Sequence, residues 1–213
     1  MFNYEEMKNK IILADCMDIM KDIPDKWFEL AIVDPEYGID AGNMVMGKGI
    51  SSKIKKSSWD AIPPDKKYFE ELFRISKNQI IFGGNYFNLP ITNSWIVWDK
   101  DRNKEISFSD GELIWTSFDF NLKIKKHKYD GFLGADTDCR IHKTQKPIAL
   151  YRWLLQNYAK PGDKIIDTHS GSGSLACACH LEKFDFLAIE KDEDYYKASV
   201  ERLDTLRSQG VLF

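Results

Sequence analysis

The stretch AIVDPEYGID, residues 31–40, places an acid, a proline and an aromatic residue directly after an apolar run. Such a run is typical of a buried strand, so Asp34, Pro35 and Tyr37 follow the point where that strand ends. A carboxylate accepts hydrogen bonds, and proline restricts the backbone without donating one. The stretch therefore predicts reactive groups at one edge of a sheet, with a second acid, Glu36, among them.

A glycine-rich loop occurs near the other end of the chain, in the stretch IIDTHSGSGSLA. Gly171, Gly173 and Ala176 form a G-x-G-x-x-A pattern between an expected strand and an expected helix. In this arrangement the backbone approaches a nucleotide-like ligand that faces the helix N-terminus. Glu190 ends the next expected strand after Asp167, where an acid can bind both hydroxyls of a ribose. The loop therefore predicts a ligand that contains adenosine.

The position of this loop favours a small adenosine ligand. A nicotinamide dinucleotide usually meets such a loop at the start of its domain, with several strands still to follow. Here only one strand and one helix follow the loop. S-adenosylmethionine needs no pyrophosphate cradle, so we expect it to be the cofactor.

Apolar runs and helical spacing alternate along the chain, which predicts an α/β fold with a mostly parallel sheet covered on both faces. No repeat or domain boundary interrupts the pattern, so we expect one domain over residues 1–213. Strands are expected at 10–15, 28–34, 79–84, 94–100, 111–118, 164–167 and 186–190. Helices are expected in 16–26, where the helix closes before Pro24, and at 63–76, 146–159, 175–184 and 192–208. Residues 40–58, rich in Gly, Ser and Lys, predict a long loop, and such loops in compact domains tend to be functional or disordered.

The composition is that of an ordinary globular protein, with 43% hydrophobic and 30% charged residues and a net charge of −3. No run approaches the roughly 18 apolar residues of a membrane span, and the first residues lack an apolar signal core, so we expect a cytoplasmic protein. The four cysteines have no zinc-like spacing, and we expect no metal.

Three motifs resemble those of amino methyltransferases. DPEY resembles their D-P-P-Y motif, and RIHKTQKP at 140–147 resembles the H-P-T-Q-K-P signature of the permuted, β-class DNA methyltransferases. DTHSGSGS is similar to their cofactor loop, and other stretches resemble small phage or prophage members. The resemblance implies a Rossmann-like, circularly permuted fold with a seven-stranded sheet and S-adenosylmethionine as cofactor. Permutation is physically simple, because the chain termini of a domain often lie close together.

The resemblance also implies the cofactor-binding residues. Asp15 and Cys16 would contact the adenine, Glu190 would hold the ribose, and the loop from Gly171 to Gly173 would pass beneath the methionine part. The full set is Asp15, Cys16, Asp34, Lys143, Thr144, Gln145, Asp167, Ser170, Gly171, Gly173, Ser174 and Glu190. Because parallel strands end at a common edge, we expect Asp15, Asp34, Asp167 and Glu190 to line it together.

Asp34, Pro35 and Tyr37 are the expected catalytic residues. The exocyclic amine of adenine or cytosine is a poor nucleophile, because its lone pair is delocalised into the ring. The Asp34 carboxylate and the Pro35 carbonyl can accept both N–H bonds and direct the nitrogen lone pair at the methyl group. Tyr37 offers a face for a base that has left the duplex, worth roughly 1–3 kcal/mol. Transfer is then direct and in line, and positioning supplies much of the rate.

The chain departs from the family pattern at three places. Glu36 stands where a second proline is usual, Lys143 follows His142 in place of a proline, and His169 stands where many members carry an aromatic residue or proline. If Glu36 points away from the base pocket, activity survives; if it faces the pocket, base binding weakens.

Two basic segments are expected to contact DNA. Larger relatives insert a recognition domain before the H-P-T-Q-K-P segment, whereas residues 119–140 are too few for an independent domain. We therefore expect a short or relaxed recognition sequence and binding that weakens steeply with salt. The expected DNA-contacting residues are Lys48, Lys53, Lys55, Lys56, Lys123, Lys125, Lys126 and Lys128.

Several readings stay open. An aspartate at the head of the motif favours adenine N6 over cytosine N4. A catalytically silent DNA- or cofactor-binding protein, with Glu36 as the lesion, would bind cofactor without turnover. A nicotinamide-dependent oxidoreductase would leave Asp34, Pro35 and Tyr37 unexplained. The expected partner is double-stranded DNA, with RNA as an alternative; a cognate restriction nuclease is a candidate partner, and the protein is a monomer or homodimer.

Overall fold

The computed structural model describes residues 2–39, 63–101, 109–128, 141 and 145–209 of the 213-residue chain. Their strands are β1 (Lys10–Leu13), β2 (Phe28–Val33), β3 (Ser76–Phe82), β4 (Ile96–Asp99), β5 (Gly111–Thr116), β6 (Lys123–Lys126), β7 (Lys164–Asp167) and β8 (Asp185–Glu190). The helices are α1 (Tyr4–Met7), α2 (Cys16–Met20), α3 (Lys66–Ile75), α4 (Ile148–Tyr158), α5 (Ser174–Glu182) and α6 (Glu193–Ser208), with a 3-10 turn, η3, at Gly84–Tyr86.

The strands form one sheet in the order β1-β8-β7-β2-β3-β5-β4-β6. The first five run parallel, β5 is antiparallel to both of its neighbours, and β6 pairs with β4 in parallel. The expected α/β architecture with a mostly parallel sheet is confirmed. The last two strands of the chain, β7 and β8, therefore lie between the first two.

The described sheet has eight strands, one more than the seven expected. The extra strand is β6, within the segment treated as a DNA-contacting insert. Its sequence KIKK contains only one apolar side chain, and Ile124 is 64% exposed, so the strand carries no burial signal. Backbone pairing with β4 is what makes it a strand, and pairing cannot be inferred from side-chain polarity.

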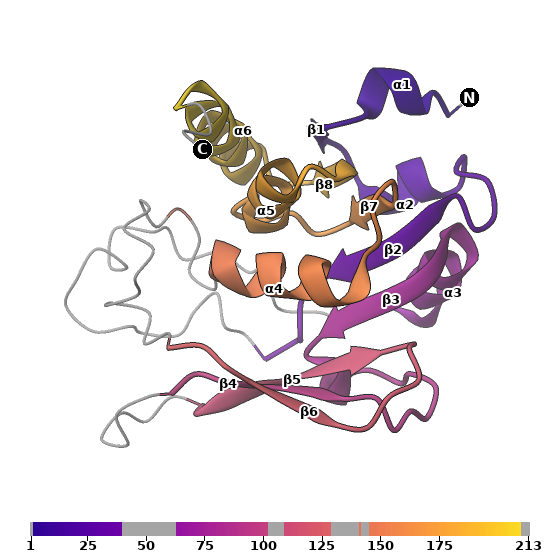
Figure 1. Ribbon diagram of the computed structural model, residues 1–213. Coiled ribbons are helices and arrows are strands. Elements are labelled where there is room, and N and C mark those ends of the chain that lie inside the picture. The colour runs from indigo at the N-terminus through magenta and orange to yellow at the C-terminus, as the bar shows by residue number, and fades with distance from the viewer. Residues whose placement is uncertain (1, 40–62, 102–108, 129–140, 142–144, 210–213) are drawn as a thin grey trace.

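Helices cover both faces of the sheet (Figure 1). On one face, α4 and α5 pack over alternate residues of the central strands, such as Leu30 and Ile32 of β2. On the other face, α2 and α3 cover Ala31 and Val33 of the same strand. This alternation follows the two-residue period of a strand, and burial on both faces explains why β2 is apolar at every position except Glu29.

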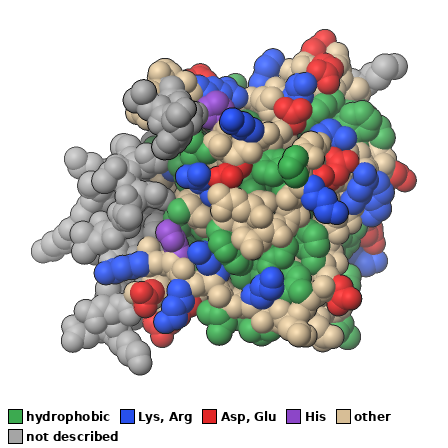
Figure 2. Space-filling model, viewed as in Figure 1, with side chains coloured by type: hydrophobic (Ala, Val, Ile, Leu, Met, Phe, Trp, Pro, Cys, Tyr) green, Lys and Arg blue, Asp and Glu red, His purple; other side chains and the backbone are tan. Residues whose placement is uncertain are grey.

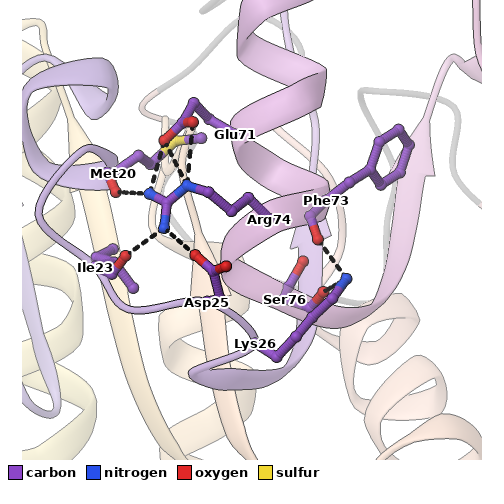
Figure 3. A network of polar contacts seen from close by, with 8 residues as sticks. All are labelled: Met20, Ile23, Asp25, Lys26, Glu71, Phe73, Arg74 and Ser76. Atoms are coloured by element: carbon purple, nitrogen blue, oxygen red, sulfur yellow. Dashed lines mark hydrogen bonds and ion pairs between the residues drawn. The ribbon is translucent and has the colours of Figure 1, made fainter.

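The connection from α2 to β2 is anchored at the amino edge of the sheet by one arginine. The Arg74 guanidinium donates hydrogen bonds to the backbone oxygens of Met20 and Ile23, at 2.7 and 2.6 Å, and also contacts Glu71 and Asp25 (Figure 3). The Lys26 ammonium donates to the carbonyl of Phe73 at 2.6 Å. These bonds tie the segment before β2 to α3 and so help to fix where β2 begins.

Candidate functional site

Four acidic side chains meet at the carboxyl edge of the sheet, as expected. Glu190 and Asp167 are the last residues of β8 and β7, and Asp15 and Asp34 follow β1 and β2 closely. These four strands are adjacent and parallel, so their carboxyl ends lie side by side. This edge is the part of an open α/β sheet where ligands bind.

The Asp34 carboxylate has two partners within the protein. One oxygen accepts a hydrogen bond from the Tyr37 hydroxyl at 2.7 Å, and the other contacts the Lys146 ammonium. The same ammonium lies 3.3 Å from the Tyr37 hydroxyl. Burial raises the pKa of Asp34, and the charge of Lys146 opposes that rise. Asp34 and Tyr37 therefore form one buried polar unit, with Lys146 as its cation.

Lys146 also connects Asp34 to a second carboxylate. Its ammonium lies 3.4 Å from Glu112 at the start of β5, and Glu112 is 2.8 Å from Lys100 just after β4. The Lys146 side chain is only 5% exposed. Burial alone would lower the pKa of Lys146, but the two carboxylates raise it above its usual value, so the ammonium stays charged. Positive and negative groups alternate in this chain, which compensates their burial.

Lys146, Glu112 and Lys100 were not predicted from the sequence. The available signal was Lys146 itself, in the RIHKTQKP stretch beside the predicted residues Lys143, Thr144 and Gln145. The Lys146 side chain is almost wholly buried. Because lysine is almost never buried without a partner, its burial in this motif indicates a functional role. Glu112 and Lys100 give no comparable signal, because their pairing depends on how β4 and β5 align.

The Tyr37 ring is packed against two other aromatic rings. Tyr86 of η3 stacks on it, with centroids 4.9 Å apart and planes 13° from parallel, and Phe87 meets it edge-on at 6.1 Å. Gly83 has φ +63°, and a Cβ there would lie 2.3 Å from the Tyr37 ring. Only glycine therefore allows this close approach. Because Tyr86 is 47% exposed, it forms the solvent side of the ring stack.

The predicted glycine loop joins β7 to α5. Gly171 and Gly173 have φ values of +50° and +70°, which only glycine adopts readily. A Cβ on Gly173 would lie 3.0 Å from Ser199 and 3.2 Å from Ile11, so the loop packs tightly against α6 and β1. The Ser174 hydroxyl donates to the backbone oxygen of Lys146 at 2.8 Å. The loop and the Asp34 unit therefore meet at one residue.

The remaining acids of the edge are held by backbone N–H groups. Glu190 accepts from the amides of Gly171 and Asp192, at 2.6 and 2.9 Å. Asp15 caps α2 by accepting from Met17 at 2.8 Å. Burial raises the pKa of Asp167 to about 7, although the amide of His169 donates to it at 3.1 Å. Burial likewise raises the pKa of the Cys16 thiol, next to Asp15, to about 12, which disfavours the reactive thiolate.

Glu36 points away from Asp34. Its carboxylate lies 3.2 Å from the His169 ring and 2.6 Å from the Lys191 ammonium. Burial would raise the pKa of Glu36, but hydrogen bonds from His169 and Lys191 lower it to about 2. The departure at Glu36 is therefore a charged contact between three strand ends, outside the Asp34 unit.

Two predicted cofactor residues are polar and buried at this edge. Gln145 accepts from the Ile141 amide at 3.0 Å. The Ser170 hydroxyl oxygen is buried and has no hydrogen-bond partner among the described residues. Lys143 and Thr144 lie outside the described residues, as do Lys48, Lys53, Lys55 and Lys56.

Four of the expected DNA-contacting lysines are described, all in the basic segment at residues 122–128, and they divide into two pairs. The Lys123 and Lys125 ammonium groups lie over the rings of Tyr158 and Trp153 of α4, at 5.7 and 5.2 Å. Lys126 ends β6 and lies 3.8 Å from Asp99, and Lys128 follows on the exposed surface. Since β6 is parallel to β4, and Asp99 pairs with the first residue of β5, Lys126 and Lys128 are nearer the carboxyl edge of β2 and β3.

The described basic side chains form no single continuous patch on the face shown in Figure 2. On the face shown in Figure 2, Lys and Arg side chains are interspersed with acidic and hydrophobic ones. Among the described residues, no group of three or more His, Cys, Asp or Glu side chains could hold a metal ion. No described helix is long and apolar enough to cross a membrane.

Comparisons of the sequence and of the structure with known proteins both find DNA methyltransferases. A family model described as DNA methylase matches residues 50–201. The type II methyltransferase M.HinfI of Haemophilus influenzae is 22% identical over 96% of this chain and 71% of its own length.

Solved structures share the fold. The M1.HpyAVI–SAM complex superposes with a TM-score of 0.58 and 21% identity, over 91% of this chain and 98% of that chain. The PvuII DNA methyltransferase, described as cytosine-N4-specific, gives a TM-score of 0.57 and 12% identity, over 93% and 91%. At these identities, the structural likeness supports the Rossmann-like α/β arrangement.

Proposed function

The chain belongs to the N6/N4 family of DNA methylases, and we propose that it transfers a methyl group from S-adenosylmethionine to the N6 amine of adenine in double-stranded DNA. The observation that carries this proposal is the position of Lys146. Its backbone oxygen accepts a hydrogen bond from Ser174 at the glycine loop, and its side chain contacts Asp34. One residue thus joins the proposed cofactor loop to the proposed base-binding group.

The residues at the glycine loop suit S-adenosylmethionine. Gly171 and Gly173 let the backbone come close to a ligand, and the buried Ser170 hydroxyl offers a hydrogen bond that no described residue takes. Each Glu190 oxygen accepts one backbone N–H, which leaves a lone pair on each for a ribose hydroxyl. When bound, the cofactor supplies an electrophilic methyl group on its sulfonium sulfur.

Asp34 and Pro35 would hold the target amine. The Asp34 carboxylate and the Pro35 carbonyl accept its two N–H bonds, so that the nitrogen lone pair points at the methyl carbon. A carboxylate has about four acceptor positions, so Asp34 can accept this bond while it keeps Tyr37 and Lys146. The new N–C bond forms as the S–C bond breaks, and the amine nitrogen then loses one proton. Asp34 is the group placed to take that proton, and its raised pKa favours this role.

Lys146 would keep Asp34 ionised in a buried setting. A buried carboxylate without a cation would take up a proton and lose its capacity to accept an N–H bond. Tyr37 would fix the orientation of the carboxylate through its hydroxyl. Its ring would stack on the base in the place that Tyr86 occupies here. The adenine assignment rests on the aspartate at the head of the motif, and cytosine N4 is the alternative.

DNA contact is proposed for the basic segment after β5. Of its described lysines, Lys126 and Lys128 lie toward the edge that carries Asp34. Phosphate contacts there would position the duplex without reading its sequence. This agrees with a short or relaxed recognition site.

Transfer of tritium from methyl-labelled S-adenosylmethionine to unmethylated DNA tests the proposed activity, with Asp34→Asn as the matched variant. We expect label in DNA with the wild-type protein and a loss of at least about 100-fold with Asp34→Asn, the order of effect expected for a misplaced reacting group. Cofactor binding by calorimetry should persist in the variant. Absence of label with a wild-type protein that binds cofactor would contradict the proposal.

A further inference from the structure

Glu36 connects three adjacent strand ends. It follows β2, its partner His169 follows β7, and its partner Lys191 follows β8. Those strands are consecutive in the sheet, in the order β8-β7-β2. The carboxylate therefore links the segment that carries Asp34 and Pro35 to the loop that carries Gly171 and to the residue after Glu190.

The Glu36 side chain is nearly buried, at 11% exposed, and His169 is 14% exposed. A carboxylate so placed is stable only when it is paired and hydrogen-bonded, and both of its oxygens are. Lys191 is 56% exposed and closes the contact from the solvent side. The contact is therefore a built feature of the edge.

The His169 ring is held in turn by its own neighbours. Its Nδ1 lies 3.0 Å from the Thr168 hydroxyl, and that hydroxyl lies 2.7 Å from the Tyr68 hydroxyl of α3. The Tyr68 ring meets the imidazole edge-on, with centroids 5.0 Å apart. A ring fixed in this way can set the position of Glu36, and through Glu36 the backbone at Pro35.

We propose that Glu36, His169 and Lys191 form a polar clasp that positions Asp34 and Pro35 relative to the glycine loop. The three are positioning residues for methyl transfer, and in this respect the inference rests on the proposed function. The two departures at positions 36 and 169 are then a matched pair: a hydrogen-bonded contact between two polar side chains stands where two apolar residues would otherwise meet. Glu36 is accordingly not a lesion.

Glu36→Pro restores the usual D-P-P-Y motif, yet it should impair the protein if the clasp positions Asp34 and Pro35. Proline removes the carboxylate and leaves His169 facing an apolar ring without its partner. We expect the single variant to lose function, not to gain it. Adding His169→Phe should restore a packed contact and recover much of that loss.

A double-mutant cycle tests this with Glu36→Pro, His169→Phe and the double variant. Two readouts apply: cofactor Kd by calorimetry without DNA, and kcat for methyl transfer with both substrates saturating. We expect each single variant to lower kcat about tenfold, because small displacements of reacting groups are costly. Each should also weaken cofactor binding. The double variant should have a higher kcat and a lower cofactor Kd than Glu36→Pro alone, so that its kcat exceeds the product of the two single effects more than about tenfold. Glu193→Gln, which breaks the exposed pair with Lys197, is the control and should change neither.

The outcomes separate the two proposals. Additive effects of Glu36→Pro and His169→Phe, or single variants equal to wild type in kcat and Kd, would overturn the clasp whether or not DNA is methylated. Coupled effects on cofactor Kd in a protein that labels no DNA would support the clasp's hold on the cofactor loop and overturn the proposed function. Thermal melting of every variant identifies any that fails to fold. If Glu36→Pro fails to fold, Glu36→Gln replaces it as the single variant, because it keeps the size of the side chain. Glu36→Gln should show the same drop in kcat.

Discussion

The Lys146 ammonium contacts the Asp34 carboxylate at the carboxyl edge of the sheet, and both side chains are largely shielded from water. The pair joins a residue just before α4 to the residue after β2, which are far apart in the sequence. Because Lys146 also touches Glu112 and, through its backbone oxygen, Ser174, it lies where the acceptor site and the cofactor loop meet.

Lys146→Met should be among the most damaging single changes at this site. It leaves Asp34 and Glu112 as buried carboxylates without their shared cation, and breaking a buried pair in this way costs about 3–5 kcal/mol. We expect a strongly lowered melting temperature and, in the folded fraction, a fall in kcat of about 100-fold or more, since Asp34 would become protonated.

Glu112→Gln is the matched comparison, because it removes one carboxylate and leaves the contact between Lys146 and Asp34 in place. Its loss of kcat should be much smaller than that of Lys146→Met. Equal losses in the two variants would show that the whole charged chain, and not the cation at Asp34, is what catalysis needs.

Tyr86 covers the ring of Tyr37 on which a target base would stack. Tyr86 stacks on Tyr37 in the protein without DNA, and we expect a target base to displace it when DNA binds. Tyr86→Ala therefore removes a competitor of the base. The variant should bind a duplex with 2-aminopurine at the target position more tightly than wild type, and with greater fluorescence. Tyr37→Ala should weaken the same binding, by an amount of the order of the roughly 1–3 kcal/mol of base stacking. Weaker binding in both variants would instead make Tyr86 a second wall of the base pocket.

Asp167 should give a pH-dependent contribution to stability. Burial raises its pKa to about 7, so the folded protein holds a proton that the unfolded chain releases above pH of about 4. Unfolding then releases a proton between these values, and stability falls as pH rises from about 4 to about 7. Asp167→Asn removes this loss. We expect its free energy of unfolding, relative to wild type, to rise by about 4 kcal/mol between pH 4 and pH 8, since a shift of one pKa unit corresponds to about 1.4 kcal/mol.

The measurement is urea denaturation of both proteins at the two pH values, without cofactor. Asp119→Asn, at an exposed position after β5, is the control for loss of one acidic side chain. A constant difference between Asp167→Asn and wild type at pH 4 and pH 8 would show that Asp167 is ionised in the folded protein throughout.

The two lysine pairs of the basic segment should differ in their contribution to DNA binding. Replacing Lys126 and Lys128 by Gln should reduce the slope of log K against log salt by about 2, since each phosphate contact contributes about 0.9. Replacing Lys123 and Lys125, whose ammonium groups lie over aromatic rings of α4, should change it by less than half as much. Lys77→Gln, at the amino edge of the sheet, is the control. The assignment of the DNA-facing edge would be wrong if the two pairs proved equivalent.

The sheet and its acidic edge could be predicted from the sequence because strands buried on both faces are continuously apolar, and parallel strands end at one edge. Asp34, Asp167 and Glu190 each follow such a run, and their juxtaposition needs only the order of strands. The glycine loop was equally visible, since positive φ at Gly171 and Gly173 calls for that residue type.

The side-chain contacts across the carboxyl edge could not be predicted from the sequence. That Glu36 meets His169 and Lys191 depends on the relative height of three loops, and the contact between Lys146 and Glu112 depends on the antiparallel start of β5. The sequence predicts that Tyr37 offers a ring face to a base, but it gives no sign that Tyr86 of η3 stacks on that ring. The β6 strand was missed because KIKK lacks an apolar face.

The most direct test of the central claim is mass spectrometry of nucleosides from unmethylated double-stranded DNA incubated with the protein and S-adenosylmethionine that carries a deuterated methyl group. Asp34→Asn is run in parallel under the same conditions. We predict deuterated N6-methyladenine with the wild-type protein and at most traces with the variant. Deuterated N4-methylcytosine would contradict the adenine assignment while leaving the site in place, and no deuterated base at all would contradict the proposed function.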